Sequence, residues 1–323
     1  MKLLVSGTSG FIGTSFCDRF SRSSSFDIVG VDRRPPRERF DTVAYAVGDL
    51  TDAAFVRALV SETEPDAIVH LAAQARVDPS LVSASPTYSD NVLATLNLIA
   101  AAEGQGVRLG RFVYASSETV YGGTTEYPSK ETSPLNPQSP YAASKAACEL
   151  LVSRGLPGKA LILRSGMGYG PRSDPEAQVV GRFIRRALHG KPILFPRTPP
   201  PEGHPTRDVN YVGNFLEGIE LALRAGVAGT YNVASGREVS IPELADAVIK
   251  AVGKGTVLEA EGFVYRQGEA GARTWLDVSK ARDDFGYQPR VQLEEGLRAT
   301  VDWYRSNWDY FNNERREISA SLS

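Results

Sequence analysis

Three glycines directly after an apolar N-terminal segment restrict the fold of this chain more than any other feature. The strand-like run 2–6 leads into Gly7, Gly10 and Gly13, where a helical stretch over 11–20 begins. Glycine allows the backbone to turn tightly and to approach a pyrophosphate, whose charge then lies at the N-terminus of the helix. Glycines that serve close packing alone are the alternative interpretation. The spacing predicts a strand, turn and helix that together bind a dinucleotide.

Short apolar segments and helical stretches alternate through the first half of the chain. This pattern is typical of a parallel sheet with helices on both faces. The predicted strands are 2–6, 27–32, 44–47, 67–71, 111–115 and 160–164, and the predicted helices are 11–20, 53–60, 91–103 and 141–153. We therefore expect an α/β fold with a doubly wound parallel (Rossmann) sheet.

The second half of the chain has a different character. A proline-rich stretch at 195–201 interrupts regular structure, and Ser240 with Glu243 resembles a capping box that begins a helix. We predict a Rossmann domain of residues 1–166 with a returning segment at about 206–236, a smaller α/β region of residues 167–205 and 237–311, and a disordered polar tail at 312–323.

The second predicted strand ends in an acid, Asp32, 19 residues beyond Gly13. A carboxylate at this point accepts hydrogen bonds from the ribose of an adenosine and repels a 2′-phosphate, which favours NAD over NADP. Arg33 and Arg34 leave NADP open, because an arginine accommodates that phosphate. A simple turn residue is the alternative for Asp32. No lysine follows the glycines as in a P-loop, which argues against a nucleoside triphosphatase.

Charge and cysteine content exclude several other classes of protein. The 323 residues include 36 Lys and Arg against 38 Asp and Glu, and the net charge of -2 gives no electrostatic basis for binding nucleic acid or an anionic membrane. Cys17 and Cys148 have no metal or redox spacing, and we expect no metal site. The apolar segment begins directly after Lys2, and no apolar run reaches membrane-spanning length. We expect a cytoplasmic protein with a small polar ligand.

Tyr141 and Lys145 stand four residues apart in a predicted helix that begins at Ser139 and Pro140. This spacing places both side chains on one face of the helix. A free tyrosine has a pKa of about 10, and a neighbouring ammonium or a bound cationic ring lowers the pKa by favouring the phenolate. Taken alone, such a pair is more often a surface tyrosine and a solvated lysine. Its meaning depends on the motifs that accompany it.

Several such motifs follow one another along the chain. They are Gly48-Asp49-Leu50, His70-Leu-Ala-Ala73, Asn91, the run 116–122, Gly168-Tyr-Gly-Pro-Arg172, Thr206-Arg207-Asp208 and Asp277-Val-Ser-Lys-Ala281. With the glycines and the Tyr141 pair, they make residues 2 to about 304 resemble the extended short-chain dehydrogenase/reductase family. The closer resemblance is to its nucleotide-sugar epimerases and dehydratases, and it is UDP-glucose 4-epimerase-like. It implies NAD as cofactor, a nucleotide sugar as substrate, and a homodimer formed by the helices at 91–103 and 141–153.

The resemblance also implies a cofactor site. Asp49 and Leu50 would flank the adenine, while Ala72 and Ala73 would let the cofactor lie close to the fourth strand. The implied cofactor-binding residues are Gly7, Gly10, Phe11, Ile12, Gly13, Asp32, Arg33, Asp49, Leu50, Leu71, Ala72, Ala73, Asn91, Tyr141 and Lys145.

By the same resemblance, Ser117 would hold the reacting oxygen of the sugar, and Tyr141 would remove the hydroxyl proton as hydride passes to the nicotinamide. Lys145 would bind the cofactor ribose and lower the pKa of Tyr141. The smaller region would bind the substrate, with guanidinium groups bridging its phosphate oxygens; surface salt bridges are the alternative for these arginines. The implied substrate-binding residues are Ser117, Met167, Arg172, Arg207 and Arg266.

The chain departs from the family pattern in three places, one of which is Gly213-Asn214 after Val212, where an aspartate is common. Met167 stands where an asparagine usually helps to hold the phosphates, and an insertion at 199–204 precedes the arginine motif. In the 4,6-dehydratases the serine or threonine is followed by an acid and then by a proton-abstracting glutamate. Here Ser117 is followed by Glu118 and Thr119, so the acid is present and the glutamate is missing. Glu118 is therefore a candidate acid or base, with a capping role as the alternative.

The sequence as a whole predicts an NAD-dependent nucleotide-sugar 4-epimerase that oxidises the sugar transiently at C4, with Tyr141 as acid and base. A dehydratase, a decarboxylase or an oxidoreductase of the same family stays open. So does a sensor that binds NAD without catalysis.

Overall fold

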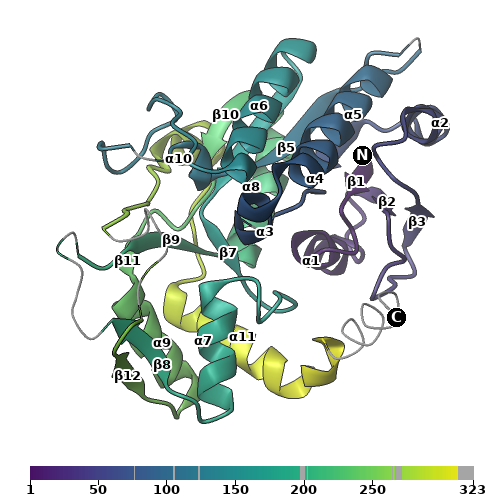
Figure 1. Cartoon of the computed structure of the whole chain (residues 1–323). Coiled ribbons are helices and arrows are strands. Elements are labelled where there is room, and N and C mark those ends of the chain that lie inside the picture. The colour runs from purple at the N-terminus through teal and green to yellow at the C-terminus, as the bar shows by residue number, and fades with distance from the viewer. Residues whose placement is uncertain are drawn as a thin grey trace.

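The computed structural model describes residues 1–75, 77–104, 106–122, 124–196, 201, 203–263, 265 and 271–311. Its largest element is a sheet of seven parallel strands in the order β10-β6-β5-β4-β1-β2-β3 (Figure 1). The strands are β1 (Lys2–Ser6), β2 (Asp27–Asp32), β3 (Val43–Val47), β4 (Ala67–His70), β5 (Arg111–Ser117), β6 (Ala160–Ser165) and β10 (Gly229–Asn232). The order reverses at β1, as in a doubly wound sheet, and the predicted fold class is confirmed.

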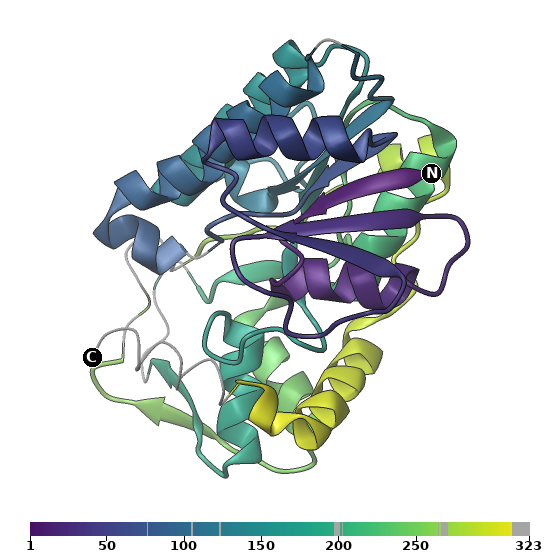
Figure 2. The same cartoon turned by 90° about the vertical axis from the view of Figure 1, so that its right-hand side faces the viewer.

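Alternating side chains along β1 explain why helices cover both faces of this sheet (Figure 2). Leu3 and Val5 join the core beneath α1, α8 and α10, whereas Leu4 joins the opposite core beneath α2, α5 and α6. All three side chains are fully buried. The helices are α1 (Phe11–Phe20), α2 (Ala53–Thr63), α5 (Ala94–Ala102), α6 (Pro140–Gly155), α8 (Val212–Ala225) and α10 (Ser279–Phe285).

Two of the helix starts expected from the sequence have a serine hydroxyl as their cap. Ser139 caps α6, because its hydroxyl accepts a hydrogen bond of 3.1 Å from the Ala142 N–H. The predicted capping box at α9 (Ile241–Val252) is only half formed. The Ser240 hydroxyl accepts the Glu243 N–H at 3.2 Å, while the Glu243 carboxylate binds Arg237. In a complete capping box the Glu243 carboxylate would accept the backbone N–H of Ser240; here it binds the guanidinium of Arg237 instead.

The smaller part of the chain forms sheets and a core of its own, below the large sheet in Figure 2. One sheet has the order β11-β9-β7, and the other pairs β12 with β8. The elements are β7 (Met167–Tyr169), α7 (Val179–Leu188), β8 (Ile193–Pro196), β9 (Thr206–Tyr211), β11 (Glu238–Ser240), α9, β12 (Val257–Ala260) and α11 (Leu293–Ser306). We call this part the second region; it includes β9, which pairs with β7 and β11. The chain returns to the large sheet through α8 and β10. The second region also includes the chain after α11 up to Phe311, and the large sheet with its covering helices and connecting segments is called the cofactor region.

Short helices complete the described chain. They are α3 (Val77–Val82), α4 (Ala84–Tyr88), the π-helical turn η1 (Ser89–Leu93), and the 3-10 turns η2 (Glu118–Val120) and η3 (Trp308–Phe311). The helix expected at 91–103 therefore begins as a π-helical turn. The tail at 312–323 and parts of the insertion at 199–204 lie outside the described residues. Within the ranges given above, no helix has the length and apolar character needed to cross a membrane.

Candidate functional site

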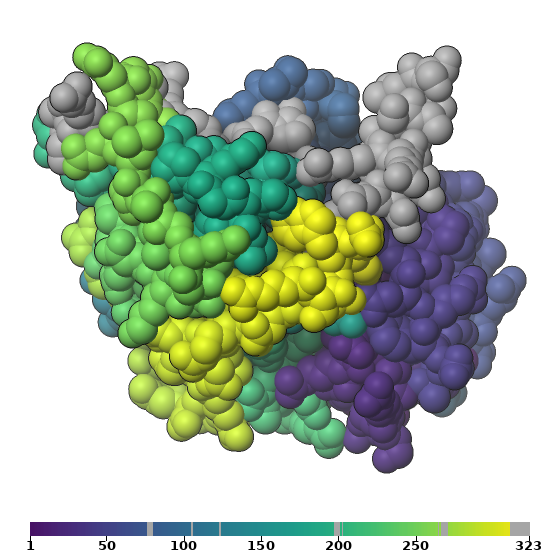
Figure 3. Space-filling view, turned by 90° about the horizontal axis from the view of Figure 1, so that it is seen from below, coloured from purple at the N-terminus to yellow at the C-terminus, as the bar shows by residue number. Residues whose placement is uncertain are grey.

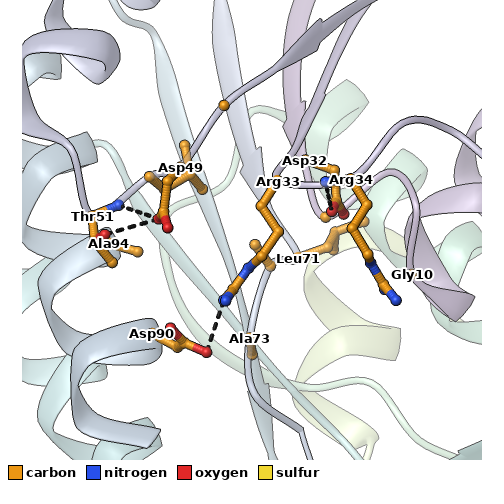
Figure 4. A pocket seen from close by; sticks show the side chains of 14 residues that line it. Gly10, Asp32, Arg33, Arg34, Asp49, Thr51, Leu71, Ala73, Asp90 and Ala94 are labelled. Carbon is orange, nitrogen blue, oxygen red and sulfur yellow. Dashed lines mark hydrogen bonds and ion pairs between the residues drawn. The ribbon is translucent and has the colours of Figure 1, made fainter. Parts of the chain in front are cut away.

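A cavity of about 370 Å³ lies at the carboxyl ends of β1, β2, β3 and β4 (Figure 4). Doubly wound sheets bind ligands at this edge. The predicted cofactor residues that line it are Gly7, Gly10, Asp32, Arg33, Asp49, Leu50, Leu71, Ala72 and Ala73. Lining residues outside the predicted set are Arg34, Gly48, Thr51, Asp90 and Ala94. Phe11 and Ile12 do not line it and pack against the core beneath the sheet.

The glycine loop is built so tightly that side chains would not fit. Gly7 has φ of 78°, a left-handed conformation, and a Cβ there would lie 2.7 Å from the backbone nitrogen of Ala72. A Cβ on Gly13 would overlap the carbonyl oxygen of Gly7. The two glycines therefore let β1, β4 and the start of α1 approach one another, and they leave backbone rather than side chains facing the cavity.

The carboxylate of Asp32 is fixed at the end of β2. It accepts hydrogen bonds from the Ser9 N–H and the Arg34 N–H, each at 3.1 Å. Arg33 extends across the cavity to Asp90 on η1, with 2.7 Å between the guanidinium nitrogen and the carboxylate oxygen, whereas Arg34 is directed the other way (Figure 4). This hydrogen bond raises the pKa of Arg33. An arginine so engaged is less available to a 2′-phosphate.

Asp49 holds the opposite wall of the cavity. Its carboxylate accepts bonds from the Thr51 N–H at 2.8 Å and the Thr51 hydroxyl at 2.9 Å. The backbone bond is the largest cause of a lowered pKa at Asp49, which keeps this carboxylate charged. The side chain thus orders the turn after β3 on the side where adenine is expected.

A buried chain of hydrogen bonds joins the end of β1 to the end of β4. The sequence did not predict these bonds. The Ser6 hydroxyl accepts the N–H groups of Leu71 and Ala72, each at 3.1 Å, and lies 2.7 Å from Nδ1 of His70. Nε2 of His70 lies 3.0 Å from the Thr95 hydroxyl. Burial lowers the pKa of His70 to about 3, so this histidine is neutral and structural. The motif beginning at His70 was the available signal.

Asn91 links the segment that follows β4 to α6. Its Oδ1 accepts the Gln74 N–H at 2.7 Å, and its Nδ2 donates to the Ser144 hydroxyl on α6 at 2.8 Å. The π-helical turn of η1 carries Asn91 into this buried position, and such turns are frequent at functional sites. Asn91 therefore acts as a brace between elements and does not line the cavity.

Ser117, Tyr141 and Lys145 come together beside this brace. Ser117 ends β5, and its hydroxyl accepts the Thr119 N–H at 3.3 Å and the Thr119 hydroxyl at 3.1 Å. Lys145 donates to the Ala115 carbonyl at 2.7 Å, and its Nζ lies 5.9 Å from the centre of the Tyr141 ring. Both α6 side chains are buried, with 8% of Tyr141 and 4% of Lys145 exposed.

The pKa shifts at this group correct one expectation. Burial raises the pKa of Tyr141 to about 12, opposed by a hydrogen bond with Ser117 and reinforced by the charge of Glu118. Burial also lowers the pKa of Lys145 to about 8. The lowering of the Tyr141 pKa that the resemblance implies is therefore not achieved by the protein groups alone, because desolvation of the phenolate is the largest effect.

Behind α6, a buried ion pair supports the same helix. Glu149 binds Arg164 of β6, with 2.6 Å between Oε2 and Nη2, and accepts the Ser116 hydroxyl at 2.5 Å. Arg164 also donates to the Tyr121 hydroxyl at 2.8 Å. The pair joins α6, β5 and β6 one turn beyond Lys145. Removal of one partner would leave a charge without compensation in the core.

Glu118 faces the second region from the start of η2. Its side chain is buried, and its Oε2 has no hydrogen-bond partner in the described part of the chain. Burial and the charge of Asp208 raise its pKa well above the usual value, against the opposite effect of Arg207. Burial therefore disfavours the charged form of Glu118, and its role as an acid or base stays a prediction.

Asp208 on β9 fastens two loops of the second region. Its carboxylate accepts the Ser235 hydroxyl and N–H, the Gly236 N–H and the Leu276 N–H, at 2.5 to 3.2 Å. Burial raises its pKa to about 6 despite these bonds. The four donors make Asp208 a structural anchor, and they place it where its charge disfavours ionisation of Glu118.

The predicted substrate residues fall in different surroundings. Arg207 on β9 donates through Nη1 to the Thr206 carbonyl at 2.7 Å and to the Ala272 carbonyl at 3.2 Å. Met167 on β7 packs against the core of the second region. Arg172 binds Glu38 and Asp18 of the cofactor region. Arg266 lies outside the described residues. Among the residues that the structure does describe, no cluster of metal-binding side chains occurs.

Comparison with known proteins places this arrangement in a family context. A profile of the NAD dependent epimerase/dehydratase family matches residues 3–234. The chain is 33% identical to a dTDP-glucose 4,6-dehydratase from Streptomyces niveus, with 95% of this chain and 94% of the relative covered. It is 34% identical to a UDP-glucose 4-epimerase from Mycolicibacterium smegmatis, with coverage of 95% and 99%.

A solved structure gives the same picture. The UDP-glucose 4-epimerase of Thermus thermophilus in complex with NAD superimposes with a TM-score of 0.83 at 34% identity, covering 95% of this chain and 100% of that one. This structural similarity extends over both regions of the molecule. The family profile, in contrast, ends at residue 234 and so leaves the last part of the second region unmatched.

Proposed function

Because this chain belongs to the NAD-dependent epimerase/dehydratase family and is an NAD-dependent enzyme, we propose that it is a nucleotide-sugar 4-epimerase. The observation that carries the proposal is Thr119. It occupies the position where the 4,6-dehydratases carry a proton-abstracting glutamate, and its hydroxyl donates to Ser117. A threonine bonded in this way supplies no base for removing a proton from C5, whereas inversion at C4 needs only the serine and the tyrosine.

The residues that line the cavity suit NAD in their chemistry. The loop through Gly7 and Gly13 presents backbone to the pyrophosphate and the start of α1. Asp32 stands ready to accept ribose hydroxyls, with Asp49 and Leu50 at the adenine side. When bound, NAD accepts and returns the hydride and brings a positively charged ring.

We assign proton transfer to Tyr141. Its phenolic oxygen takes the proton of the sugar C4 hydroxyl and later returns it, while the Ser117 hydroxyl holds the same sugar oxygen. A pKa of about 12 is too high for a base near neutral pH. A protonated Lys145 together with a cationic ring lowers it, since opposite charges favour the phenolate. Arg207 and Arg266 are proposed to bind the substrate diphosphate.

Product analysis tests the proposal. The chain is incubated in D₂O with UDP-, dTDP-, GDP- and CDP-sugars, and products are identified by NMR. An epimerase yields the C4 epimer with C5 still carrying hydrogen, because only the hydride at C4 moves. Loss of water or carbon dioxide, or deuterium at C5, contradicts the epimerase assignment. Tyr141→Phe serves as the control for background exchange.

A 4,6-dehydratase is the second candidate, and Glu118 favours it. A buried carboxyl whose pKa is raised, and whose Oε2 has no hydrogen-bond partner among the described residues, is suited to protonating a leaving hydroxyl, and the Streptomyces niveus relative is a dehydratase. The D₂O experiment separates the two candidates, because dehydration requires exchange at C5. A sensor without catalysis would leave every sugar nucleotide unchanged.

A homodimer is proposed from the outer faces of α4, η1, α5 and α6. Leu150 is 60% exposed, and Tyr88, Leu93 and Leu96 are 42%, 41% and 40% exposed. Three of them line a shallow hollow with Ala84 and Val92. Apolar side chains gathered in this way favour burial against a second copy. Sedimentation of the wild type as a dimer and of Leu96→Lys as a monomer supports this, and a monomeric wild type contradicts it.

A further inference from the structure

Arg172 makes an unusually complete set of contacts for an arginine in a loop. It lies after β7, in the second region, and binds Glu38 through two parallel bonds of 2.7 Å, from Nε to Oε1 and from Nη2 to Oε2. Its Nη1 donates to Asp18 of α1 at 3.1 Å. The ring of Trp303 lies 5.9 Å from the guanidinium carbon. Paired, parallel bonds of this type fix orientation as well as distance.

The backbone at Arg172 shows that its neighbours hold it in place. Its φ is 71°, in the left-handed region that residues other than glycine seldom adopt. Such a conformation costs free energy and persists only where the surrounding contacts outweigh the cost. Only 13% of the Arg172 side chain is exposed, against 29% for Glu38 and 41% for Asp18. The shielded guanidinium therefore binds more strongly than one in an open surface pair.

Both partners of Arg172 belong to elements that frame the cofactor cavity. Glu38 lies in segment 33–42, which starts directly after Asp32 and joins β2 to β3. The first residues of that segment are tied to the glycine loop, because the Ser9 hydroxyl lies 2.9 Å from the Arg34 carbonyl. Asp18 lies on α1, whose N-terminus begins at the glycine loop. Arg172 thus connects two sides of the cavity from outside it.

A second contact between the same segment and the second region lies close by. The guanidinium of Arg37 stacks on Tyr310 of η3, with 5.4 Å between the carbon and the ring centre. In Figure 3 the yellow surface of α11 and η3 borders the purple surface of the N-terminal part. Segment 33–42 is therefore held by the second region at two points, of which the Arg172 contact carries the ion pair.

We propose that Arg172 is a positioning residue that latches segment 33–42 against α1, and so slows the release of NAD from its ribose side. This assignment replaces the substrate-binding role expected for Arg172 from the sequence. It rests on the proposed function, in which one NAD molecule takes the hydride and gives it back. A cofactor released between these two steps would leave a keto sugar behind, so slow release protects the cycle.

The test measures NAD release from the loaded enzyme. Wild type and variants are loaded with radiolabelled NAD and chased with unlabelled NAD, and retained label is followed over time. Arg172→Met and Glu38→Gln are expected to release label about tenfold faster, since a shielded charged bond contributes on this scale. Arg172→Lys keeps the charge without the fork and should release at an intermediate rate. Combining Arg172→Met with Glu38→Gln should add nothing, because both remove the same latch.

Arg224→Met is the matched control, because that arginine pairs with Glu220 on the exposed face of α8. It should release NAD at the wild-type rate. A wild-type release rate in both Arg172→Met and Glu38→Gln overturns the latch, as does a raised KM for the sugar nucleotide with unchanged NAD release. Glu38→Gln keeps Arg172 in place, so it reports on the latch even if Arg172→Met is unstable. Reaction products play no part in the assay, so a failed epimerase test leaves its result standing.

Discussion

The cofactor cavity and the group of Ser117, Tyr141 and Lys145, called here the proposed reacting site, differ in how the fold treats their polar side chains. In the cavity, the charged groups of Asp32, Asp49 and Arg33 each have a defined hydrogen-bond or ion-pair partner. At the reacting site, burial disfavours the charged forms of Tyr141 and Lys145.

The difference shows where this protein depends on its ligands. Polar groups that are satisfied by the fold are ready to bind without rearrangement, whereas buried ionisable groups with shifted pKa values store a cost that bound charges can relieve. The cavity is therefore a completed receptor. The reacting site is completed only when cofactor and substrate supply the missing charges.

The largest effect is expected from Tyr141→Phe. Loss of the phenolic oxygen removes the proton acceptor, and kcat should fall by about 10² to 10⁴. NAD affinity should change little, because Tyr141 does not line the cofactor cavity. Steady-state kinetics and NAD titration measure the two quantities. If NAD affinity fell as far as kcat, the separation between the two sites would be disproved.

Lys145 predicts an effect of pH on stability. Its pKa is about 8 in the folded chain and 10.5 in the unfolded one, so the unfolded state binds more protons between these values. The cost of burying the ammonium is complete below pH 8 and disappears as pH rises to 10.5, a gain of roughly 3 kcal/mol in unfolding free energy. Urea unfolding of wild type and Lys145→Met over this range measures it. Parallel curves for the two proteins would refute the shift.

The raised pKa of Glu118 predicts the opposite dependence, in which the unfolding free energy falls as pH rises. Because burial raises its pKa, the folded chain binds the extra proton above pH 4.5, and stability is lost as pH rises through the folded pKa. The wild type should lose up to about 1.4 kcal/mol for each pH unit relative to Glu118→Gln. Unfolding of both proteins between about pH 5 and 8 gives the difference. A difference that does not vary with pH would mean that Glu118 is ionised in the folded state.

The smallest effect is expected in the cavity itself, from Asp90→Asn. The substitution releases Arg33 from its ion pair, and a released arginine can approach a 2′-phosphate. The ratio of NADP to NAD affinity should rise by less than about tenfold, since one partly exposed ion pair is worth at most about 1 kcal/mol. Fluorescence titration with both reduced cofactors measures it. An unchanged or lower ratio would show that the ion pair with Asp90 does not keep Arg33 away from a 2′-phosphate.

Local backbone requirements are what made the cavity predictable. The spacing of Gly7, Gly10 and Gly13 and the acid at the end of β2 are demands that neighbouring residues place on one another, so they are visible along the sequence. The partners of Arg172 are not visible in this way. Glu38 and Asp18 lie 134 and 154 residues away from it, and only the packing of the second region brings them together.

The same contrast applies to other residues of the site. Asp90 forms an ion pair with Arg33, and His70 forms a hydrogen bond with Thr95. No rule of sequence spacing predicts either pair. The pKa of Tyr141 depends on how deeply α6 is buried, which the residues next to it in the sequence do not reveal. Sequence motifs therefore predicted that Ser117, Tyr141 and Lys145 lie together, but they did not reveal how burial shifts the pKa of Tyr141.

The position of the cavity residues along the chain has a consequence for biosynthesis. Every residue that lines the cavity lies between Gly7 and Ala94, whereas the groups facing Glu118 come from β9. At about 5 to 20 residues per second, a ribosome needs roughly 6 to 23 s to pass from Ala94 to Arg207. All the residues that line this cavity thus leave the ribosome before Arg207 and Asp208, whose charges act on Glu118. Glu118 therefore gains its charged neighbours only after the whole lining of the cavity has been synthesised.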